Sequence, residues 1–514
     1  MQFIGYCYSF IGRERESRRQ ESRSVSLMAS RVGNPGKIAK SLPRFVRRLN
    51  SAPSSFTTQL PPPLNFAEKP DPTPAAAAAK SVLDFEDAKE LFLSVRTSKL
   101  VKSAVALHVL AIEPAVDAGI RVMNSRLMEI PVVRETVMGL VERTFYGQFC
   151  AGRDLEEVAR TVAGMSETGI KAMLDYGSEH SHDNESCDRS MNDILQTVDS
   201  AKSLPPVSFV VLKITAICPP KLLKRVSDLL RWEYKNPAFN LPWKQKSLPV
   251  LSDSSALYHT SKTPEPLTQE EERDLELGHE RLQKICRSCL EAGVPLLVDA
   301  EDTTVQPAID YMTYSAAVSY YKDDGPLVFG TVQAYLKDAK ERLVAVKMAA
   351  GKMGIPIGFK LVRGAYMTSE SGLASALGAG SPIHDTIHNT HKCYNDCASF
   401  MLEEIAAGSG AVVIATHNIE SGKLAATKAI DLGIKRDNQK LQFAQLYGMS
   451  EGLSFGLKKA GFQVSKYLPF GPVDQIMPYL LRRAEENRGL LSASSLDRQL
   501  MRKELKRRLA SIIL

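Results

Sequence analysis

The sequence has no run of apolar residues that approaches the roughly 18 needed to cross a membrane as a helix. It has no disulfide framework either, because its eight cysteines are scattered along 514 residues, a distribution typical of a reducing compartment. The net charge of +7 is not gathered into a basic stripe with aromatic platforms, as nucleic-acid binding would require. These absences argue against a membrane-spanning protein, a disulfide-stapled secreted domain and a nucleic-acid-binding protein.

Acidic residues are missing from Ser22 to Ala67, where serines and basic residues are frequent. A basic, serine-rich and acid-free segment is typical of an organellar transit peptide. The first 27 residues contain three glutamates, which suit a transit peptide badly, so Met28 is an alternative start. We expect residues 1–78 to be a transit peptide and a disordered linker. The alternative is a basic tail without a targeting role.

The remainder of the chain changes from a helical pattern to an alternation of short apolar segments and helices. Residues 79–165 show only helical periodicity and predict an N-terminal helical arm. Eight short, often β-branched segments follow, at 170–177, 207–217, 294–302, 326–336, 355–366, 411–418, 441–448 and 464–471. Strands of this kind, buried on both faces and separated by helices, predict an α/β fold with a (βα)8, TIM-like barrel over residues 166–490.

Two features bear on this barrel prediction. The rival, a doubly wound open sheet, lacks its usual GxGxxG fingerprint between a strand and a helix. Residues 218–268 are rich in Pro, Ser and Lys, and we interpret them as an insertion after the second strand with its own short helix. Residues 491–514 are expected to form a C-terminal helix.

The segment from Tyr467 to Asn487 is expected to run as a strand, turn at Gly471-Pro472 and continue as a helix. One face of that helix is apolar, and a different face carries polar residues at the same i, i+3, i+4 and i+7 spacing: Tyr479, Arg482, Arg483 and Glu486. Two guanidinium groups on one face predict a receptor for a carboxylate. The alternative is a solvated face with an ordinary Arg482–Glu486 pair.

Polar residues recur where the predicted strands end, which is where a barrel of this kind carries its chemistry. They are Lys213 on the second strand; Asp299, Glu301 and Asp302 on the third; Gln333 and Tyr335 on the fourth; Lys360, Arg363, Gly364 and Tyr366 on the fifth; Thr416, His417 and Asn418 on the sixth; Gln445 and Tyr447 on the seventh; and Tyr467 on the eighth. A charged residue in a buried strand is costly unless it is paired. We therefore expect most of these residues to be partners or ligands.

Two other interpretations stay open at this point. The segment HDTIHNTHKCYNDC gathers potential zinc ligands, which would suit a zinc hydrolase or lyase: His384, His388, His391, Cys393 and Cys397. The simpler explanation is surface histidines and core cysteines of a helix, and it is favoured because a catalytic zinc also needs an acidic partner and an open position. A non-enzymatic barrel used for binding is disfavoured, because the buried charges at its strand ends would then be desolvated without a purpose.

Six motifs occur in order over about residues 165–490: LLVDAED, VQAYL, FKLVRGAYM, ATHN, FAQLYGM and YLPFGPxxxxxPYLLRRAxEN. Together they resemble the proline dehydrogenase family, flavoenzymes that begin proline catabolism, and the insertion is most similar to plant mitochondrial members. The resemblance implies a distorted (βα)8 barrel that binds FAD without a covalent bond. It also implies oxidation of L-proline to 1-pyrroline-5-carboxylate by hydride transfer to the flavin.

The resemblance further implies the roles of individual residues. In the substrate site, Arg482 and Arg483 would hold the proline carboxylate, and Glu486 and Tyr479 would orient these arginines. Tyr467 and Leu446 would pack on the proline ring, and Tyr366 would help to close the site. Lys213 and Asp299 would form an ion pair at the floor of the site. Hydroxyproline-preferring relatives carry a small residue at the Tyr467 position, so we expect a preference for proline.

For the cofactor, the resemblance implies that Gln333 and Lys360 face the flavin. It also implies a set of residues that hold the rest of FAD: Arg363, Gly364, Ala365, Thr416, His417, Asn418 and Gln445. Lys360 stands where other members carry arginine, so it keeps the charge but loses the two-pronged donor. Electrons are expected to pass to a quinone of the inner mitochondrial membrane, with peripheral attachment of the protein on the matrix side.

Overall fold

The computed structural model describes residues 82–123, 125–204, 206–236, 238–250, 263–322, 325–489 and 493–513. The predicted transit peptide and linker, residues 1–78, lie outside the described residues. The chain divides into two compact units. Of the first unit the structure describes Asp117–Arg134 except residue 124, which form helical turns. The second unit, Ala67–Val116 with Glu135–Leu514, contains the sheet.

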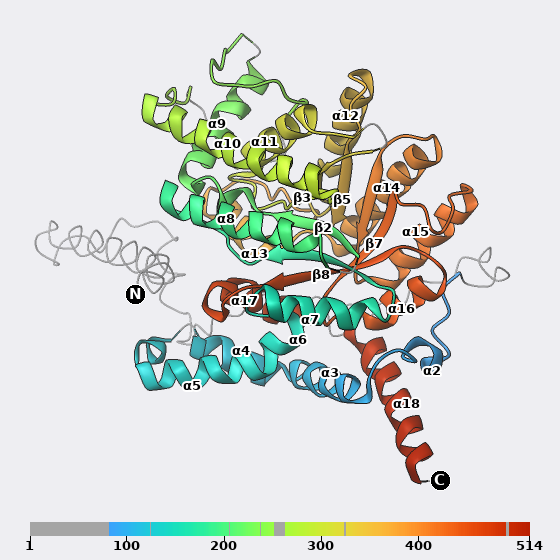
Figure 1. Cartoon of the computed structure of the whole chain (residues 1–514). Coiled ribbons are helices and arrows are strands. Elements are labelled where there is room, and N and C mark those ends of the chain that lie inside the picture. The colour runs from blue at the N-terminus through green and yellow to red at the C-terminus, as the bar shows by residue number, and fades with distance from the viewer. Residues whose placement is uncertain are drawn as a thin grey trace, which may run out of the picture. The chain divides into compact units, whose positions relative to one another are not determined.

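Eight parallel strands form a closed barrel in which every strand pairs with its neighbours in sequence and β1 pairs with β8 (Figure 1). The strands are β1 (Lys171–Tyr176), β2 (Val207–Leu212), β3 (Leu296–Val298), β4 (Val328–Gln333), β5 (Gly358–Val362), β6 (Ala411–Ala415), β7 (Leu441–Leu446) and β8 (Val464–Phe470). The predicted (βα)8 barrel is confirmed, and each strand lies inside one of the eight predicted segments.

Most strands are shorter than predicted, mainly at their carboxyl ends. After β2 the chain leaves the sheet at Lys213 and forms a 3-10 turn, η4 (Ile214–Ala216). After β3 it leaves at Asp299, whose N–H still donates to the carbonyl of Leu212 at 2.9 Å. The polar residues of these segments therefore lie in loops at the barrel mouth, where side chains are free to reach a ligand.

The barrel interior is apolar at its base. One cluster of side chains from alternate strand positions fills it: Met173, Phe209, Val211, Leu297, Phe329, Ala411, Val413, Ala444 and Tyr467, with Ala415 and Leu446 packed against it. The rings of Phe209 and Phe329 meet edge to face at 4.8 Å between centroids. Gly358 makes room for Phe329, because a Cβ at this position would lie 2.2 Å from that ring. Burial of this cluster is the main stabilising contribution of the sheet.

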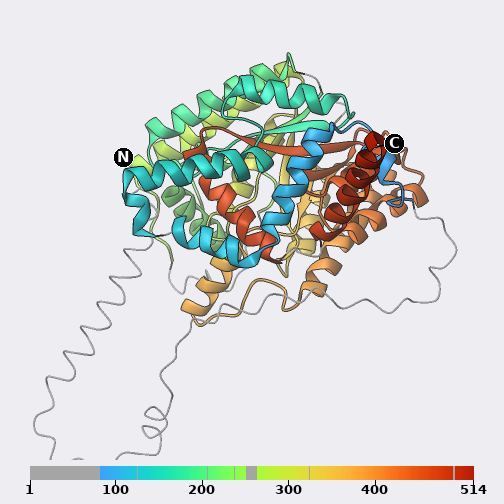
Figure 2. The same ribbon diagram turned by 90° about the horizontal axis from the view of Figure 1, so that it is seen from below.

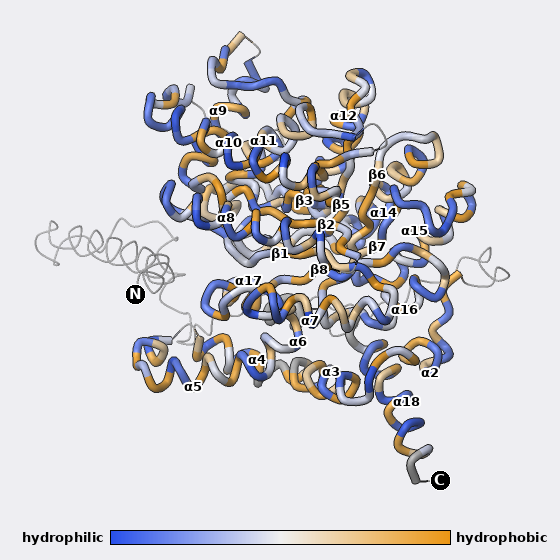
Figure 3. The backbone as a smooth tube through the Cα atoms, in the orientation of Figure 1, coloured by the Kyte–Doolittle hydropathy of each residue, from blue (hydrophilic) through white to orange (hydrophobic). Residues whose placement is uncertain are grey.

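Helices of the second unit surround the strands in both views of the molecule (Figures 1 and 2). The described helices of both units are α2 (Ala88–Leu91), α3 (Thr97–Leu110), α4 (Glu113–Met123), α5 (Pro131–Val141), α6 (Gly147–Phe149), α7 (Leu155–Ser166), α8 (Asn184–Ala201), α9 (Pro220–Lys235), α10 (Gln269–Ala292), α11 (Gln306–Ser319), α12 (Ala339–Lys352), α13 (Met367–Ala376), α14 (Ile387–Ala406), α15 (Ile419–Asp431), α16 (Glu451–Lys459), α17 (Val473–Gly489) and α18 (Ala493–Ile513), with the short turns η2 (Arg126–Glu129) and η3 (Glu142–Tyr146). Hydrophobic and hydrophilic residues alternate along the outer helices, as expected for helices with one buried face (Figure 3).

Two helices, α9 and α10, connect β2 to β3. Helix α9 lies in the segment predicted as an insertion, and it packs against α10 and α11 as part of the helical layer. Helix α10 begins with a capping box, in which Thr268 accepts from the N–H of Glu271 at 3.2 Å and Glu271 accepts from the N–H of Thr268 at 2.9 Å. This cap fixes where the long helix starts.

The C-terminal helix α18 packs against α2, α3 and α16 (Figure 2). Asp497 on α18 accepts the N–H groups of Glu451 and Gly452, both at 2.9 Å, and so caps the N-terminus of α16. In the part of the chain that is described, no helix has the length and apolar content needed to cross a membrane.

Candidate active site

Four charged side chains and one tyrosine meet inside the barrel at the carboxyl ends of the strands. Lys213 donates to both oxygens of Asp175, at 3.0 and 3.1 Å, and lies 3.7 Å from Asp299. Asp299 also pairs with Lys360 and accepts a hydrogen bond from the Tyr467 hydroxyl at 2.8 Å. The ammonium of Lys360 lies 5.2 Å from the centre of the Tyr467 ring. Two cations and two carboxylates therefore balance one another in a buried network.

The network refines the predicted floor of the site. Lys213 and Asp299 do form an ion pair, but the closer partner of Lys213 is Asp175 and that of Asp299 is Lys360. Burial favours the neutral amine of Lys213, but the charges of Asp175 and Asp299 outweigh the effect of burial and raise the pKa of Lys213. Burial favours neutral Asp299 as well, but Lys360 and Lys213 lower its pKa. Both groups thus stay charged, and removing one partner of such a buried pair costs about 3–5 kcal/mol.

Arg482 on α17 is held by a carboxylate from the loop after β1. Its two terminal nitrogens donate to the two oxygens of Glu179 at 3.0 and 3.1 Å, which is the parallel, two-pronged geometry of a strong pair. Burial opposes ionisation of Glu179, but Arg482 more than offsets this and lowers the pKa of Glu179 to about 2. The Arg482 guanidinium also lies 5.9 Å from the centre of the Tyr366 ring.

Arg483, the next residue on α17, is buried, and its guanidinium lies 5.1 Å from the centre of the Tyr479 ring. Arg483 therefore does not lie on a solvated face, and Arg482 is partly buried. The side chain of Glu486, predicted to orient them, lies outside the described residues. The orienting carboxylate that the structure describes is Glu179.

Tyr366 lies near both the Arg482–Glu179 pair and Asp299 of the buried network. It begins helix α13, and its hydroxyl lies within electrostatic reach of Arg482, Glu179, Glu301 and Asp299, while burial raises its pKa. Its closing role stays a prediction. Leu446 at the end of β7 packs beside Tyr467 in the barrel cluster, as expected for residues that contact a small ring.

Glu301 is a buried carboxyl group without a cationic partner among the described residues, apart from a contact of 3.9 Å with the ring of His180. It accepts from the N–H and the hydroxyl of Thr215 at 3.3 and 2.8 Å. Burial raises the pKa of Glu301 to about 8, with help from Glu179. The carbonyl of Glu301 accepts from the side-chain amide of Gln333 at 2.8 Å, which fixes that predicted flavin-facing residue at the end of β4.

Arg363, which follows β5, lies in a pocket of uncharged acceptors. It donates to His391 Nδ1 at 3.0 Å, Thr416 Oγ1 at 2.8 Å and Ser421 Oγ at 2.7 Å, and it stacks 4.3 Å from the Tyr394 ring centre. No carboxylate pairs with it in the described parts of the chain. Burial lowers its pKa. A buried guanidinium of this kind is suited to an anionic ligand such as a phosphate.

The end of β6 supplies further groups beside Arg363. Asn418 caps α15 by accepting from the N–H of Ser421 at 2.8 Å, and its own N–H donates to Thr416 Oγ1 at 3.0 Å. Burial, with the nearby cations Lys466 and Arg483, lowers the pKa of His417 to about 3. His417 is therefore neutral, and its Nε2 accepts from the N–H of Leu446 at 3.1 Å. These residues place a helix N-terminus next to the Arg363 guanidinium, a favourable arrangement for an anion.

Gly364 and Ala365 form the turn after Arg363. A Cβ at Gly364 would lie 2.1 Å from the Tyr335 ring, and the backbone there has φ of 138°, so only glycine fits. Ala365 is exposed, so its backbone is open to a ligand.

Gln445 is the one predicted cofactor residue that the structure places elsewhere. Its neighbours Ala444 and Leu446 belong to the barrel interior, so its side chain points outward toward α16. There its amide accepts from the Ser454 hydroxyl at 2.8 Å and donates to the Thr416 carbonyl at 3.4 Å. The side chain therefore lies between α16 and the end of β6. Its predicted role toward the cofactor stays a prediction.

Two residues that complete the site were not among the predicted ones. Asp175 is a charged residue inside an apolar strand. Lys213 was predicted as a site residue for the same reason, so Asp175 could have been predicted in the same way. Its inward position follows from alternation with Met173. Glu179 lies in the loop after β1, and no local pattern marks it. Its partner Arg482 is 303 residues away.

The histidine and cysteine cluster does not form a metal centre in the described part of the chain, where no group of three or more His, Cys, Asp or Glu residues is placed to hold a metal ion. His391 instead accepts a hydrogen bond from Arg363. The cysteines Cys393 and Cys397 are buried on α14.

A closed parallel barrel with a charged site at the carboxyl ends of its strands defines an enzyme of the (βα)8-barrel class. A family model described as proline dehydrogenase matches residues 158–496. The chain is 58% identical over 461 residues to proline dehydrogenase 1, mitochondrial, of Arabidopsis thaliana, covering 88% of this chain and 91% of that protein. It is 57% identical over 457 residues to proline dehydrogenase 2, mitochondrial, of the same plant, covering 88% and 94%. The chain therefore belongs to the proline dehydrogenase family.

A solved structure agrees with the fold. Proline utilization A from Bdellovibrio bacteriovorus, inactivated by N-propargylglycine, matches with a TM-score of 0.56 at 19% sequence identity. The match covers 84% of this chain and 42% of that chain, so this chain spans less than half the length of that protein. At this identity the similarity shows the fold alone.

Proposed function

We propose that this chain oxidises L-proline to 1-pyrroline-5-carboxylate, with FAD as its cofactor and a quinone as its electron acceptor. The reaction and the dependence on a flavin follow from membership of the family. The observation that carries the substrate assignment is the pair Arg482 and Arg483 on α17, next to the buried network at the barrel mouth.

The residues present suit FAD. Arg363 is a buried guanidinium with only uncharged partners among the described residues, and the N-terminus of α15 lies beside it, so together they provide for the phosphates. Gly364 and Ala365 leave the backbone after β5 accessible to the cofactor. Gln333 and Lys360, on neighbouring strands, face the barrel interior and would lie against the flavin ring. When bound, the flavin supplies the oxidant that takes the hydride from the ring carbon next to the proline nitrogen.

The residues of this chain bind and orient the substrate. Arg482 and Arg483 would hold the proline carboxylate with charge-assisted hydrogen bonds, while Glu179 keeps Arg482 in position. Tyr467 and Leu446 would support one face of the ring, which fixes the reacting carbon. Tyr366, just before α13, would cover the site and exclude water. Positive charge develops on nitrogen as the hydride leaves, and the nearby carboxylates Asp299 and Glu179 favour that charge.

The proton that the amine must lose before oxidation needs an acceptor. Burial raises the pKa of Glu301 to about 8, so the protonated form predominates at neutral pH and only the minor ionised fraction can accept a proton. Solvent at the barrel mouth is the simplest acceptor.

The chain is mitochondrial, in agreement with the two plant relatives. Its position on the matrix side of the inner membrane, with peripheral attachment and delivery of electrons to a quinone, belongs to the proposal.

The purified protein tests this function directly. It should show flavin absorbance bands, contain no stoichiometric zinc, and reduce a soluble quinone analogue only when L-proline is present. The product should give the coloured adduct that 1-pyrroline-5-carboxylate forms with o-aminobenzaldehyde. A protein with bound zinc and no flavin would contradict the proposal.

A further inference from the structure

A cavity away from the candidate active site is lined by the first half of α10 and by Trp243 and Gln245 in the segment that follows α9. Its volume is about 490 Å³, within the range of small-molecule sites. None of its lining residues belongs to the strands or to the catalytic network. The proposed function does not use this cavity, so its composition needs a separate explanation.

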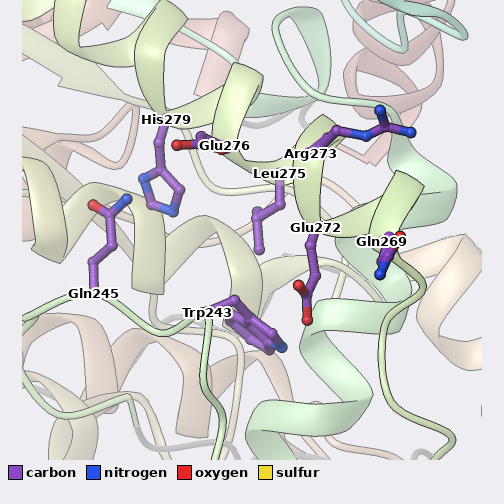
Figure 4. A pocket seen from close by; sticks show the side chains of 8 residues that line it. All are labelled: Trp243, Gln245, Gln269, Glu272, Arg273, Leu275, Glu276 and His279. Atoms are coloured by element: carbon purple, nitrogen blue, oxygen red, sulfur yellow. The ribbon is translucent and has the colours of Figure 1, made fainter.

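The cavity is also lined by a buried histidine, His279, whose Nε2 has no hydrogen-bond partner in the part of the chain that the structure describes. His279 is 4% exposed. Its ring packs edge to face on Tyr311 at 5.3 Å, which fixes its direction. Figure 4 shows the His279 ring directed from α10 toward Gln245 and Trp243. An unsatisfied buried polar group is costly, so this nitrogen is suited to a ligand that supplies the missing partner.

One wall of the cavity is aromatic. Trp243 packs edge to face on Tyr311 at 5.8 Å between ring centroids. The N–H of Gln245 donates to the Tyr311 hydroxyl at 2.7 Å, which holds the segment after α9 in place. The wall is thus built before a ligand arrives, which lowers the cost of binding.

The rim carries negative charge. Glu272 and Glu276 are exposed, lie one turn apart on α10 and form no ion pair within the described residues. Like charges at this spacing destabilise a helix. In Figure 4 the side chain of Arg273 points away from His279, and the carboxylate of Glu272 is directed toward Trp243. A cation at the rim would remove the repulsion between Glu272 and Glu276.

We propose that this cavity binds a small organic ammonium ion with an apolar or aromatic body. The ammonium group would lie between Glu272 and Glu276, and the body would contact Leu275 and the face of Trp243, which attracts cations as well as apolar groups. A hydrogen-bonding group at the far end would meet His279. The site is separate from the site for proline and needs no covalent step.

The sequence has two tryptophans, Trp232 and Trp243, so Trp232→Phe makes Trp243 the sole tryptophan reporter. The flavin-loaded full chain with this change is titrated with 2-phenylethylammonium as the probe, and its neutral isostere 2-phenylethanol is titrated in parallel. We expect a saturable change in tryptophan emission with the ammonium ion and at least tenfold weaker binding of the alcohol. The same titration of Trp243→Phe should show no saturable change.

Two pairs of variants that remove the same charge test whether binding depends on the glutamates at the rim or only on the net charge of the protein. In the Trp232→Phe background, the pair Glu272→Gln and Glu276→Gln should weaken binding of the ammonium ion at least tenfold. The pair Glu270→Gln and Glu280→Gln, on the same helix but away from the cavity, should leave it within twofold. All four glutamates are exposed, so folding is preserved in both pairs. Absence of saturation, equal binding of the alcohol, or equal weakening by both pairs would overturn the proposal.

Discussion

Glu179 and Arg482 meet through two parallel hydrogen bonds of 3.0 and 3.1 Å, although 303 residues separate them in the chain. One comes from the loop after β1 and the other from α17, so the pair joins the first and last parts of the barrel at its mouth. The same guanidinium is proposed to hold the carboxylate of proline. Its position in the free protein is therefore set before the substrate binds.

Replacing Glu179 by Gln should weaken proline binding. The change keeps the size of the side chain but removes the charge that orients Arg482, and a hydrogen bond to a charged group contributes about 1.5–3 kcal/mol. We expect the KM for proline to rise about tenfold, with a smaller fall in kcat. Steady-state kinetics with proline measures both values.

A matched control for this prediction is Glu185→Gln on α8. Glu185 also pairs with an arginine, Arg189, but both side chains are mostly exposed. Exposed pairs of this kind contribute little, so the kinetics should not change. If Glu179→Gln behaved like the control, Glu179 would have no part in positioning Arg482.

The Tyr467 ring should decide between proline and 4-hydroxyproline. The ring fills the interior beside Leu446, and its hydroxyl is already bonded to Asp299. A ring hydroxyl on the substrate would be buried without a partner, at a cost of about 1–3 kcal/mol, or tenfold or more in kcat/KM. We expect Tyr467→Ser to narrow the preference for proline, with some loss of proline activity.

The variant Tyr467→Phe separates the space that the ring fills from the hydrogen bond that its hydroxyl makes. It keeps the aromatic ring and loses the hydrogen bonds of the hydroxyl, which donates to Asp299 at 2.8 Å and accepts from Lys213 at 3.4 Å. The preference for proline should therefore persist while kcat falls modestly. Comparable kcat/KM values for the two substrates in the unmodified protein would show that Tyr467 does not set the pocket.

Buried Glu301 should make the stability of the protein depend on pH near neutrality. Burial raises its folded-state pKa from 4.5 to about 8, so between these values the folded state holds a proton that the unfolded state has lost. The stabilisation is complete below pH 4.5 and declines as pH rises, by up to about 1.4 kcal/mol per pH unit, until it is lost above about pH 8.

The variant Glu301→Gln mimics the protonated form and removes this dependence. Relative to the unmodified protein, its melting temperature should increase progressively from pH 6 to pH 8 and then stay constant. Scanning fluorimetry of both proteins in the same buffers measures the difference. A difference that is independent of pH would show that Glu301 ionises normally.

A reporter fused to residues 28–78 tests the predicted targeting segment. Because this segment is basic, rich in serine and largely free of acidic residues, we expect the fusion to enter mitochondria. Microscopy with a mitochondrial marker gives the result, and a version with its arginines changed to glutamine serves as the control. A diffuse cytosolic signal, or import into chloroplasts alone, would contradict the prediction.

The eight strands and most of the mouth residues were predictable because a buried parallel strand leaves a short, apolar, β-branched segment, and the residues that end it are polar. Lys213, Asp299 and Tyr467 were found in this way. Asp175 was within reach of the same argument. Gln445 lies between two interior residues, Ala444 and Leu446, so alternation along β7 turns its side chain outward, which its position at a strand end does not reveal.

Other features depended on contacts between distant parts of the chain. Glu179 has no local signature, since its role arises only when the loop after β1 meets α17. The pairing of Lys213 with Asp175, and of Lys360 with Asp299, depends on the register of strands around the closed barrel. Sequence identifies the charges but not which ones become neighbours.

The central claim, that α17 carries the receptor for the proline carboxylate, is tested most directly by anaerobic titration of the flavin spectrum with L-proline. The unmodified protein should lose its visible absorbance in a saturable manner. The double variant Arg482→Met, Arg483→Met should bind the same amount of flavin but be reduced with kcat/KM lowered at least about 30-fold, since truncating one partner of a desolvated pair costs about 2–5 kcal/mol. Reduction of the double variant with an unchanged kcat/KM would contradict the account.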